Sequence, residues 1–260
     1  MGVPGIAMIL YTVREPAAQD LAGTLRRVRE AGFEYVQWSS MPELPAVEIR
    51  RALDAAGLTT ISGHCGLEPF ETNFREAVEF WHTLGVADLA LATMMTECRD
   101  SLGDWRHGLQ RMVAVAQRLR DEGIRFSYHN HAFEFERFPE DTRFRMNILL
   151  DETPSDLVHA EFDTAWVSAG KADPAAYIRN FAGRCPLIHV KDHKPLVNPD
   201  QEPEPTELGR GVLDWSAILD AARASNVEWL VYEQDASEGD VFESCQVSYA
   251  FLRDRLRGRT

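Results

Sequence analysis

Short apolar runs of strand length recur along the chain and alternate with segments of helical periodicity. Eight runs have this length, and between most of them apolar residues recur three or four positions apart. The expected strands cover residues 5–11, 33–38, 58–64, 87–93, 124–129, 157–163, 186–190 and 228–233. The expected helices cover residues 20–32, 46–57, 73–85, 105–123, 173–183 and 214–226. The pattern predicts a repeated strand–helix unit.

The number and order of these units predict the fold class. Several helical segments end in glycine just before the next strand, as expected where a left-handed residue closes a helix. No glycine-rich phosphate loop follows the first strand, which disfavours an open dinucleotide-binding sheet. Eight units in 260 residues fit an α/β protein of the (β/α)8 TIM barrel type. We expect one domain spanning residues 1–260.

The segment 192–213 differs from the rest of the chain. It is rich in proline and has neither helical nor strand periodicity, so it is expected to be a loop. Because it follows the seventh strand, it should emerge at the catalytic face of the barrel, where long loops often form lids over substrate.

Composition and charge narrow the classes of partner. The chain has 27 Lys and Arg against 41 Asp and Glu, a formal charge of -14 that would repel a phosphate backbone. We therefore expect no nucleic-acid partner. The N-terminal apolar run is too short for a signal peptide or a membrane span, and the four cysteines form no CxxC pair. A cytoplasmic protein with no membrane partner is expected; a homo-oligomer is left open.

Polar residues stand at the ends of four late strands, and these are the candidate metal ligands. The fifth strand ends at His129, the sixth at Asp163 and the seventh at His189, while Glu233 ends the eighth. In a barrel these ends converge around one axis. Carboxylates and imidazoles suit a divalent ion such as Mn²⁺, Mg²⁺, Co²⁺ or Zn²⁺.

Each of these residues also has a purely structural interpretation. Asp163 could cap the helix that follows the sixth strand, and His189 could be a satisfied histidine of the core. Glu233 could pair with Lys191 or Arg210. The convergence of all three positions favours the metal site.

The stretch YHNHAFEFE, residues 128–136, leaves the fourth ligand open. If the fifth strand alternates regularly, His129 and His131 both point inward; either could bind the ion and leave the other as acid or base. Glu134 is a third candidate, because it could reach back to the axis or merely cap the next helix.

Further polar residues should line the same mouth. His64 ends the third strand, Lys191 and Asp192 follow the seventh, and Arg210 lies in the expected lid. They suit a polyhydroxylated or anionic substrate, although His64 and Asp192 have structural interpretations of equal weight. Lys191 and Arg210 could neutralise an enolate-like or phosphate oxygen.

Several of these motifs together resemble the xylose isomerase-like TIM barrel superfamily, the sugar phosphate isomerase/epimerase group. The matching pieces span nearly the whole chain in order: ILYTVRE, ISGHCGLE, YHNHAFEFE, EFDTAWVSAGKADPAAYI, LIHVKDHK, LGRGVLDW and VYEQD. The resemblance implies a divalent metal with one ligand on each of four late strands, and Asp163, His189 and Glu233 match three of those positions. His129 stands where epimerases of this group usually present Glu, and Gln37 where many relatives have Glu.

The chemistry implied is proton abstraction from carbon next to a carbonyl. The leading hypothesis is a metal-dependent isomerase or epimerase of sugars or keto-sugars, with Glu233 and His131 as the acid/base pair and Lys191 as a further catalytic group. The alternative enzyme is a dehydratase or lyase of the inosose, dehydroshikimate or 3-keto-glycoside kind. From another class, the alternative is a non-catalytic sugar-binding barrel.

Overall fold

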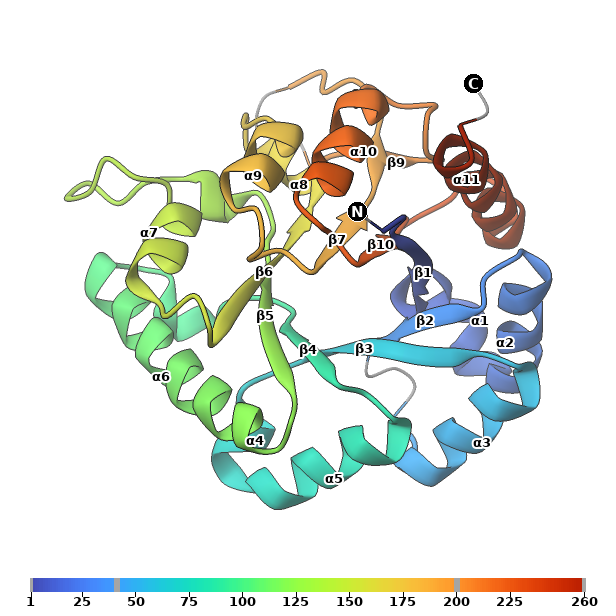
Figure 1. Cartoon of the computed structure of the whole chain (residues 1–260), viewed down its shortest axis with the longest axis horizontal. Coiled ribbons are helices and arrows are strands. Elements are labelled where there is room, and N and C mark those ends of the chain that lie inside the picture. Colours follow the sequence, from blue (N-terminus) through green and yellow to red (C-terminus); the bar gives the residue numbers. More distant parts are fainter. Residues whose placement is uncertain (1, 40–42, 199–201, 259–260) are drawn as a thin grey trace.

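A computed structural model describes the chain except residues 1, 40–42, 199–201 and 259–260. Within the described residues, eight parallel strands close into a barrel and helices surround it (Figure 1). The order around the barrel is β1, β10, β7, β6, β5, β4, β3, β2, so β10 closes the ring onto β1. The strands are β1 (Gly5–Ile9), β2 (Tyr35–Trp38), β3 (Thr59–Cys65), β4 (Asp88–Leu91), β5 (Arg125–His129), β6 (Val158–Asp163), β7 (Leu187–Val190) and β10 (Trp229–Tyr232). The predicted TIM barrel is confirmed.

The outer helices each bury one apolar face against the strands. In α5, Val78, Trp81 and Leu84 recur three positions apart and are all buried. Gly57 and Gly85 end α3 and α5 in the left-handed conformation that turns the chain toward the next strand. The six predicted helices are α2 (Leu21–Glu30), α3 (Ala46–Ala56), α5 (Phe74–Leu84), α6 (Leu102–Asp121), α9 (Pro174–Asn180) and α10 (Trp215–Ala224).

Other helices lie outside the predicted set, and their sequences show why. α8 has only six residues and starts directly after β6. In α11, Ser244 and Ser248 are buried beside Cys245 and Leu252, so polar residues interrupt the apolar stripe. These helices are α1 (Arg14–Gln19), α4 (Glu68–Thr72), α7 (Arg145–Glu152), α8 (Thr164–Ala169) and α11 (Val241–Leu256), with 3-10 turns at Leu10–Val13, Thr96–Cys98 and Phe133–Phe135.

The inside of the barrel has an apolar layer beneath a polar one. Ala7, Ile9, Leu187 and Val231 form a separate buried cluster. Leu187 lies two residues before His189 on β7, and Val231 two residues before Glu233. Because residues two apart on a strand face the same side, the next inward positions along the strands belong to the polar layer.

The segment 192–213 was expected to be a loop, and within its described part it contains a short antiparallel pair. β8 (Asp192–His193) pairs with β9 (Pro205–Thr206), and Lys194 N donates to Glu204 O at 2.8 Å. Two-residue strands are too short to show a period of two, which is why the sequence did not indicate them. Residues 199–201 of this segment lie outside the described part.

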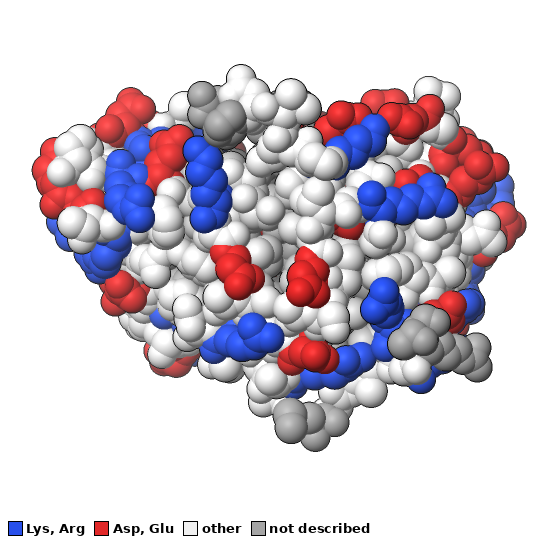
Figure 2. Space-filling model, turned by 90° about the horizontal axis from the view of Figure 1, so that it is seen from above, with Lys and Arg blue, Asp and Glu red and all other residues white. Residues whose placement is uncertain are grey.

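Acidic and basic side chains are mixed on the surface. On the face seen in Figure 2, Lys and Arg are interspersed with Asp and Glu rather than gathered into one stripe. The four cysteines are free and buried. No helix in the described part of the chain combines the length and the apolar character needed to cross a membrane.

Candidate metal centre and active-site pocket

Four strand ends bring two imidazoles and two carboxylates together. His129 ends β5, Asp163 ends β6, His189 lies on β7 and Glu233 follows β10. Each offers one ligand atom, these atoms lie within 4.8 Å of one another, and all four residues are buried. Asp163 and His189 are register partners on neighbouring strands, which places them side by side. Their donor atoms suit a divalent ion.

The two carboxylate oxygens of Asp163 have different hydrogen-bond partners. Oδ1 accepts from Trp166 N at 2.8 Å and caps α8, so the structural interpretation of this residue is correct for one oxygen. Oδ2 has no hydrogen-bond partner among the described residues, although Lys191 Nζ lies 3.9 Å away. A buried oxygen in this position needs a cation or a donor.

The two histidines also fit a metal centre. Within the same described part of the chain, His129 Nδ1 is buried without a close hydrogen-bond partner, although Glu161 Oε1 lies 3.5 Å away. His189 Nδ1 lies 2.7 Å from Glu233 Oε2. Among the described residues, Asp163 Oδ2 is the ligand atom of this cluster that most needs a cation, and a divalent ion bound beside it would satisfy it.

Glu161 is a buried member of this polar layer that the sequence analysis did not single out. Its Oε1 lies 2.6 Å from His64 Nε2 and 3.1 Å from His189 Nε2, and its Oε2 accepts from Gln37 Nε2 at 2.7 Å. Among the described residues, His64, His129, Glu161 and His189 form a second, overlapping set of ligand atoms. Strand parity would have found Glu161, because it lies two residues before Asp163 on β6.

The pKa values of these carboxylates are strongly shifted. Burial opposes ionisation of Glu161, but the imidazoles of His189 and His64 outweigh it and hold its pKa well below the usual range. Burial also opposes ionisation of Glu233, yet Lys191 and His189 keep the pKa of Glu233 well below its usual value. For Asp163 burial dominates and raises the pKa to about 7. Groups shifted in opposite directions at one site are typical of catalytic centres.

Lys191 and His131 supply charge and a free imidazole nitrogen beside the candidate ligands. Lys191 is 2% exposed; its Nζ lies 2.5 Å from Asp235 Oδ2 and 3.8 Å from Glu233 Oε2. Burial alone would lower the pKa of Lys191, but the surrounding carboxylates raise it above its usual value. Burial and the charge of Lys191 lower the pKa of His131 to about 4. At neutral pH, Lys191 is therefore a cation and His131 a neutral base.

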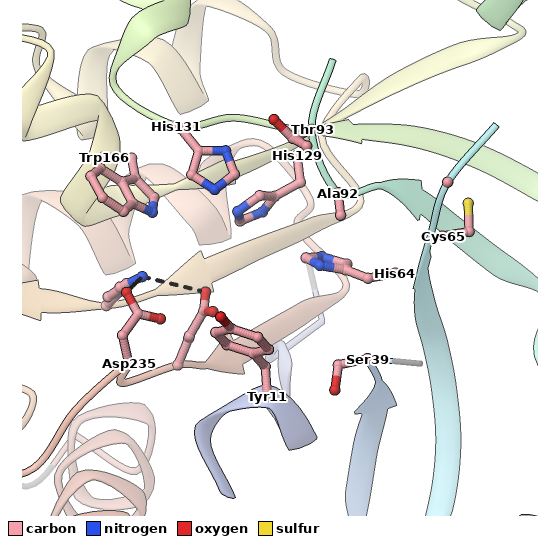
Figure 3. A pocket seen from close by; sticks show the side chains of 13 residues that line it. Tyr11, Ser39, His64, Cys65, Ala92, Thr93, His129, His131, Trp166 and Asp235 are labelled. Carbon is pink, nitrogen blue, oxygen red and sulfur yellow. Dashed lines mark ion pairs between the residues drawn. The ribbon is translucent and has the colours of Figure 1, made fainter. Parts of the chain in front are cut away.

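His131, Lys191 and Glu233 line a cavity of about 520 Å³, a size typical of small-molecule sites. In Figure 3 the rings of His64, His129 and His131 point toward the middle of the pocket, and Trp166 and Asp235 close one side. The cavity is lined by Tyr11, Ser39, His64, Cys65, Gly66, Ala92, Thr93, His129, His131, Trp166, Lys191, Glu233 and Asp235.

The structure places three predicted site residues elsewhere. Glu134 is buried and accepts from Tyr128 OH at 2.6 Å and from His131 N at 2.8 Å; neither ligand set found among the described residues includes it. Asp192 turns its carboxylate toward the backbone of the 207–214 loop, which favours its structural interpretation. Arg210 is exposed and pairs with Glu207 at 3.3 Å, on the rim of a different cavity. Of the expected lid, Glu202 and Pro203 border a neighbouring cavity rather than this one.

With fold and site in view, the chain belongs to the xylose isomerase-like TIM barrel family, whose model matches residues 25–254. Comparison with curated proteins finds no match. Among solved structures, it is similar to a sugar phosphate isomerase/epimerase from Parabacteroides distasonis, with 19% identity and a TM-score of 0.81 over 96% of this chain and 94% of the other.

Two further structures share the fold with different activities in their names. An L-ribulose 3-epimerase is 18% identical, with a TM-score of 0.74 over 98% of this chain and 95% of the other. A probable 3-DHS dehydratase from Bacillus anthracis, involved in petrobactin synthesis, is 12% identical, with a TM-score of 0.75 over 96% and 99%. At these identities the likeness shows the fold alone.

Proposed function

We propose that this protein is a divalent-metal-dependent isomerase or epimerase of sugars or keto-sugars that transfers a proton next to a carbonyl. The observation that supports it most is the convergence of His129, Asp163, His189 and Glu233 in one buried cluster. Two of its members, His129 and Glu233, line the pocket. The orphaned Asp163 Oδ2 adds weight, because a buried carboxylate oxygen without a donor is costly unless a cation binds it.

The residues beside the cluster suit proton transfer. When bound, a divalent ion would polarise the oxygen next to the reacting carbon. In our proposal neutral His131 takes or returns the proton on one side of the substrate, and Glu233 does so on the other. Lys191, held as a cation by its carboxylate neighbours, balances the charge that develops on the substrate oxygen. His64 lines the pocket and is placed to contact a hydroxyl group.

A dehydratase or lyase is the second candidate, and one feature favours it. β5 ends in the imidazole of His129, with His131 two residues on, whereas the two-glutamate epimerases that this chain resembles use a carboxylate there. A single base that removes the proton, with expulsion of a β-hydroxyl or an aglycone, needs no second carboxylate. The products distinguish the two reactions, since only the lyase releases water or an aglycone.

Metal content and hydrogen exchange test the proposal together. Protein purified without chelator and supplied with Mn²⁺ should hold about one ion per chain. In D₂O it should incorporate deuterium at the carbon next to the carbonyl of a ketose, within a panel of free and phosphorylated ketoses. Glu233→Gln should abolish exchange, because it removes both a ligand and a base. Glu48→Gln, an exposed residue on α3, is the matched control and should leave exchange unchanged.

Two results would contradict the proposal in different ways. Bound metal without exchange or product on any substrate would favour a non-catalytic sugar-binding barrel. Full turnover by Glu233→Gln on a competent substrate would remove Glu233 from its proposed role.

A further inference from the structure

Gln37 and Glu161 form a hydrogen-bonded pair directly beneath His189. Gln37 lies on β2 and Glu161 on β6, so the pair spans the inside of the barrel. Gln37 is 0% and Glu161 1% exposed. Both side chains contact the same nitrogen, because His189 Nε2 lies 2.8 Å from Gln37 Oε1 and 3.1 Å from Glu161 Oε1.

The pair has one consistent arrangement of donors and acceptors. An ionised carboxylate only accepts hydrogen bonds, so the atom of Gln37 that lies 2.7 Å from Glu161 Oε2 must be its amide nitrogen. The amide oxygen of Gln37 then faces His189 Nε2. Because that oxygen also only accepts, His189 Nε2 must carry the hydrogen and donate it.

This arrangement fixes the role of the other ring nitrogen. With the hydrogen on Nε2, the lone pair of a neutral His189 is on Nδ1, which lies 2.7 Å from Glu233 Oε2. Two lone-pair atoms this close repel each other unless a proton or a shared cation lies between them. Nδ1 is therefore the nitrogen that faces the candidate metal ligand Glu233.

We propose that the Gln37–Glu161 pair holds the Nε2 hydrogen of His189 and so directs Nδ1 to the metal ion, which makes Glu161 a positioning residue rather than a ligand. This proposal rests on the metal site proposed above. The proposal also favours the ligand set without Glu161. In the set that contains Glu161, the nearest nitrogen of His189 is Nε2, which already carries a hydrogen and so cannot bind the ion. Such outer partners orient metal-bound histidines and raise their basicity.

The pair predicts how substitutions at the two positions combine. Gln37→Glu alone would set two carboxylates against each other at the 2.7 Å contact. Glu161→Gln alone would leave two amides and no charge to hold the imidazole. The double variant Gln37→Glu with Glu161→Gln keeps one carboxylate and one amide. The carboxylate at position 37 would accept from His189 Nε2, and the amide at position 161 would donate to that carboxylate.

The test measures Mn²⁺ affinity and the position of the imidazole hydrogen in the full chain. Glu161→Gln should weaken Mn²⁺ binding about 10- to 100-fold without abolishing it. Gln37→Glu should also weaken Mn²⁺ binding, and the double variant should recover most of the loss.

Nitrogen NMR of imidazole-labelled, Zn²⁺-loaded protein should show His189 with hydrogen on Nε2 and the ion on Nδ1. A His189→Gln sample identifies the signal of His189. Ser127→Ala, a buried change on β5, is the control and should alter neither result.

Several outcomes would overturn the proposal. Complete loss of Mn²⁺ in Glu161→Gln, with binding kept in Asp163→Asn, would make Glu161 a ligand of the other set. Unchanged affinity in Glu161→Gln, or an ion on His189 Nε2, would remove the positioning role. If the parent binds no Mn²⁺, the proposed function fails, and the pair is then judged on the metal-free protein alone. There, absence of the His189 Nε2 hydrogen would reject it.

Discussion

The carboxylate of Glu134 lies buried between two donors and holds the start of the loop that follows β5. Tyr128 OH and His131 N donate to its two oxygens, and Tyr128 OH also accepts from Met94 N at 3.1 Å. Burial raises the pKa of Glu134 to about 7 in spite of these donors. Glu134 thus supports His131, a proposed base, from behind.

This raised pKa predicts a pH dependence of stability. Because the folded state holds the Glu134 proton more tightly than the unfolded state, the free energy of unfolding should fall as pH rises from about 4.5 to about 7. At about 1.4 kcal/mol per pKa unit, the contribution is up to roughly 3 kcal/mol. Glu134→Gln has no proton to lose, so relative to the parent it should gain stability over this range. Urea unfolding at a series of pH values, with EDTA present, measures the difference.

Metal binding supplies the control for this prediction. Glu134→Gln should still bind Mn²⁺, because Glu134 belongs to neither ligand set. Parallel pH curves for parent and variant would show that folding does not raise the pKa of Glu134, and loss of Mn²⁺ would return it to the list of ligands.

Among the elements, the loop between β9 and α10 receives several of its hydrogen bonds from one side chain of β8. Asp192 Oδ2 accepts from Gly209 N at 3.0 Å, Gly211 N at 3.2 Å and Trp215 Nε1 at 2.7 Å, while Oδ1 accepts from His193 N at 2.9 Å. A Cβ at Gly211 would lie 2.1 Å from Asp192 Oδ1 and 2.4 Å from a backbone oxygen, so the close approach requires glycine there. The carboxylate organises the loop.

Asp192→Asn should therefore loosen this loop. The amide would direct its own N–H groups at backbone donors, and leaving buried donors unsatisfied costs about 1–3 kcal/mol. We expect a matching loss of unfolding free energy and faster proteolytic cleavage between residues 207 and 214. Asp214→Asn is the control, because Asp214 caps α10 and asparagine caps equally well. Equal stability and cleavage for the two variants would contradict the role given to Asp192.

At the scale of the whole molecule, the sequence predicted the barrel because its strands are buried on both faces. Mainly apolar runs such as those at β7 and β10 stand out against amphipathic helices, and all eight expected strands are present. The short β8–β9 pair and α8 depend on single hydrogen bonds and caps, which leave no periodic signal.

The candidate site was predictable where a polar residue lies at or just beyond the C-terminal end of a strand. Asp163, His189 and Glu233 come together as their positions indicated. Glu161 gave no such signal because it lies in the middle of β6, and its hydrogen-bond partners come from other strands. The orientation of Asp192 was equally hidden, since a carboxylate at the mouth of a barrel can face either substrate or backbone.

The candidate ligands come from β5, β6, β7 and the end of β10, so a bound ion would join strands from residue 129 to residue 233. An ion that binds only the folded barrel stabilises it by mass action, about 2.7 kcal/mol at a hundred times its dissociation constant. For a chain of this size that corresponds to a rise of roughly 5–10 °C in Tm. Thermal melts with saturating Mn²⁺ and with EDTA should differ by this amount.

The variants of Asp163 separate metal binding from the structural role of the same residue. Asp163→Asn keeps an oxygen to cap α8 but removes the anionic ligand, so its Tm in EDTA should match or exceed that of the parent and should not rise with Mn²⁺. Stability need not fall, because burial raises the pKa of Asp163 to about 7 and the substitution removes this buried charge. Asp163→Ala loses the cap as well and should be less stable by about 1 kcal/mol. If Mn²⁺ raised the Tm of Asp163→Asn as much as that of the parent, the ion would not need the Asp163 carboxylate and would bind elsewhere.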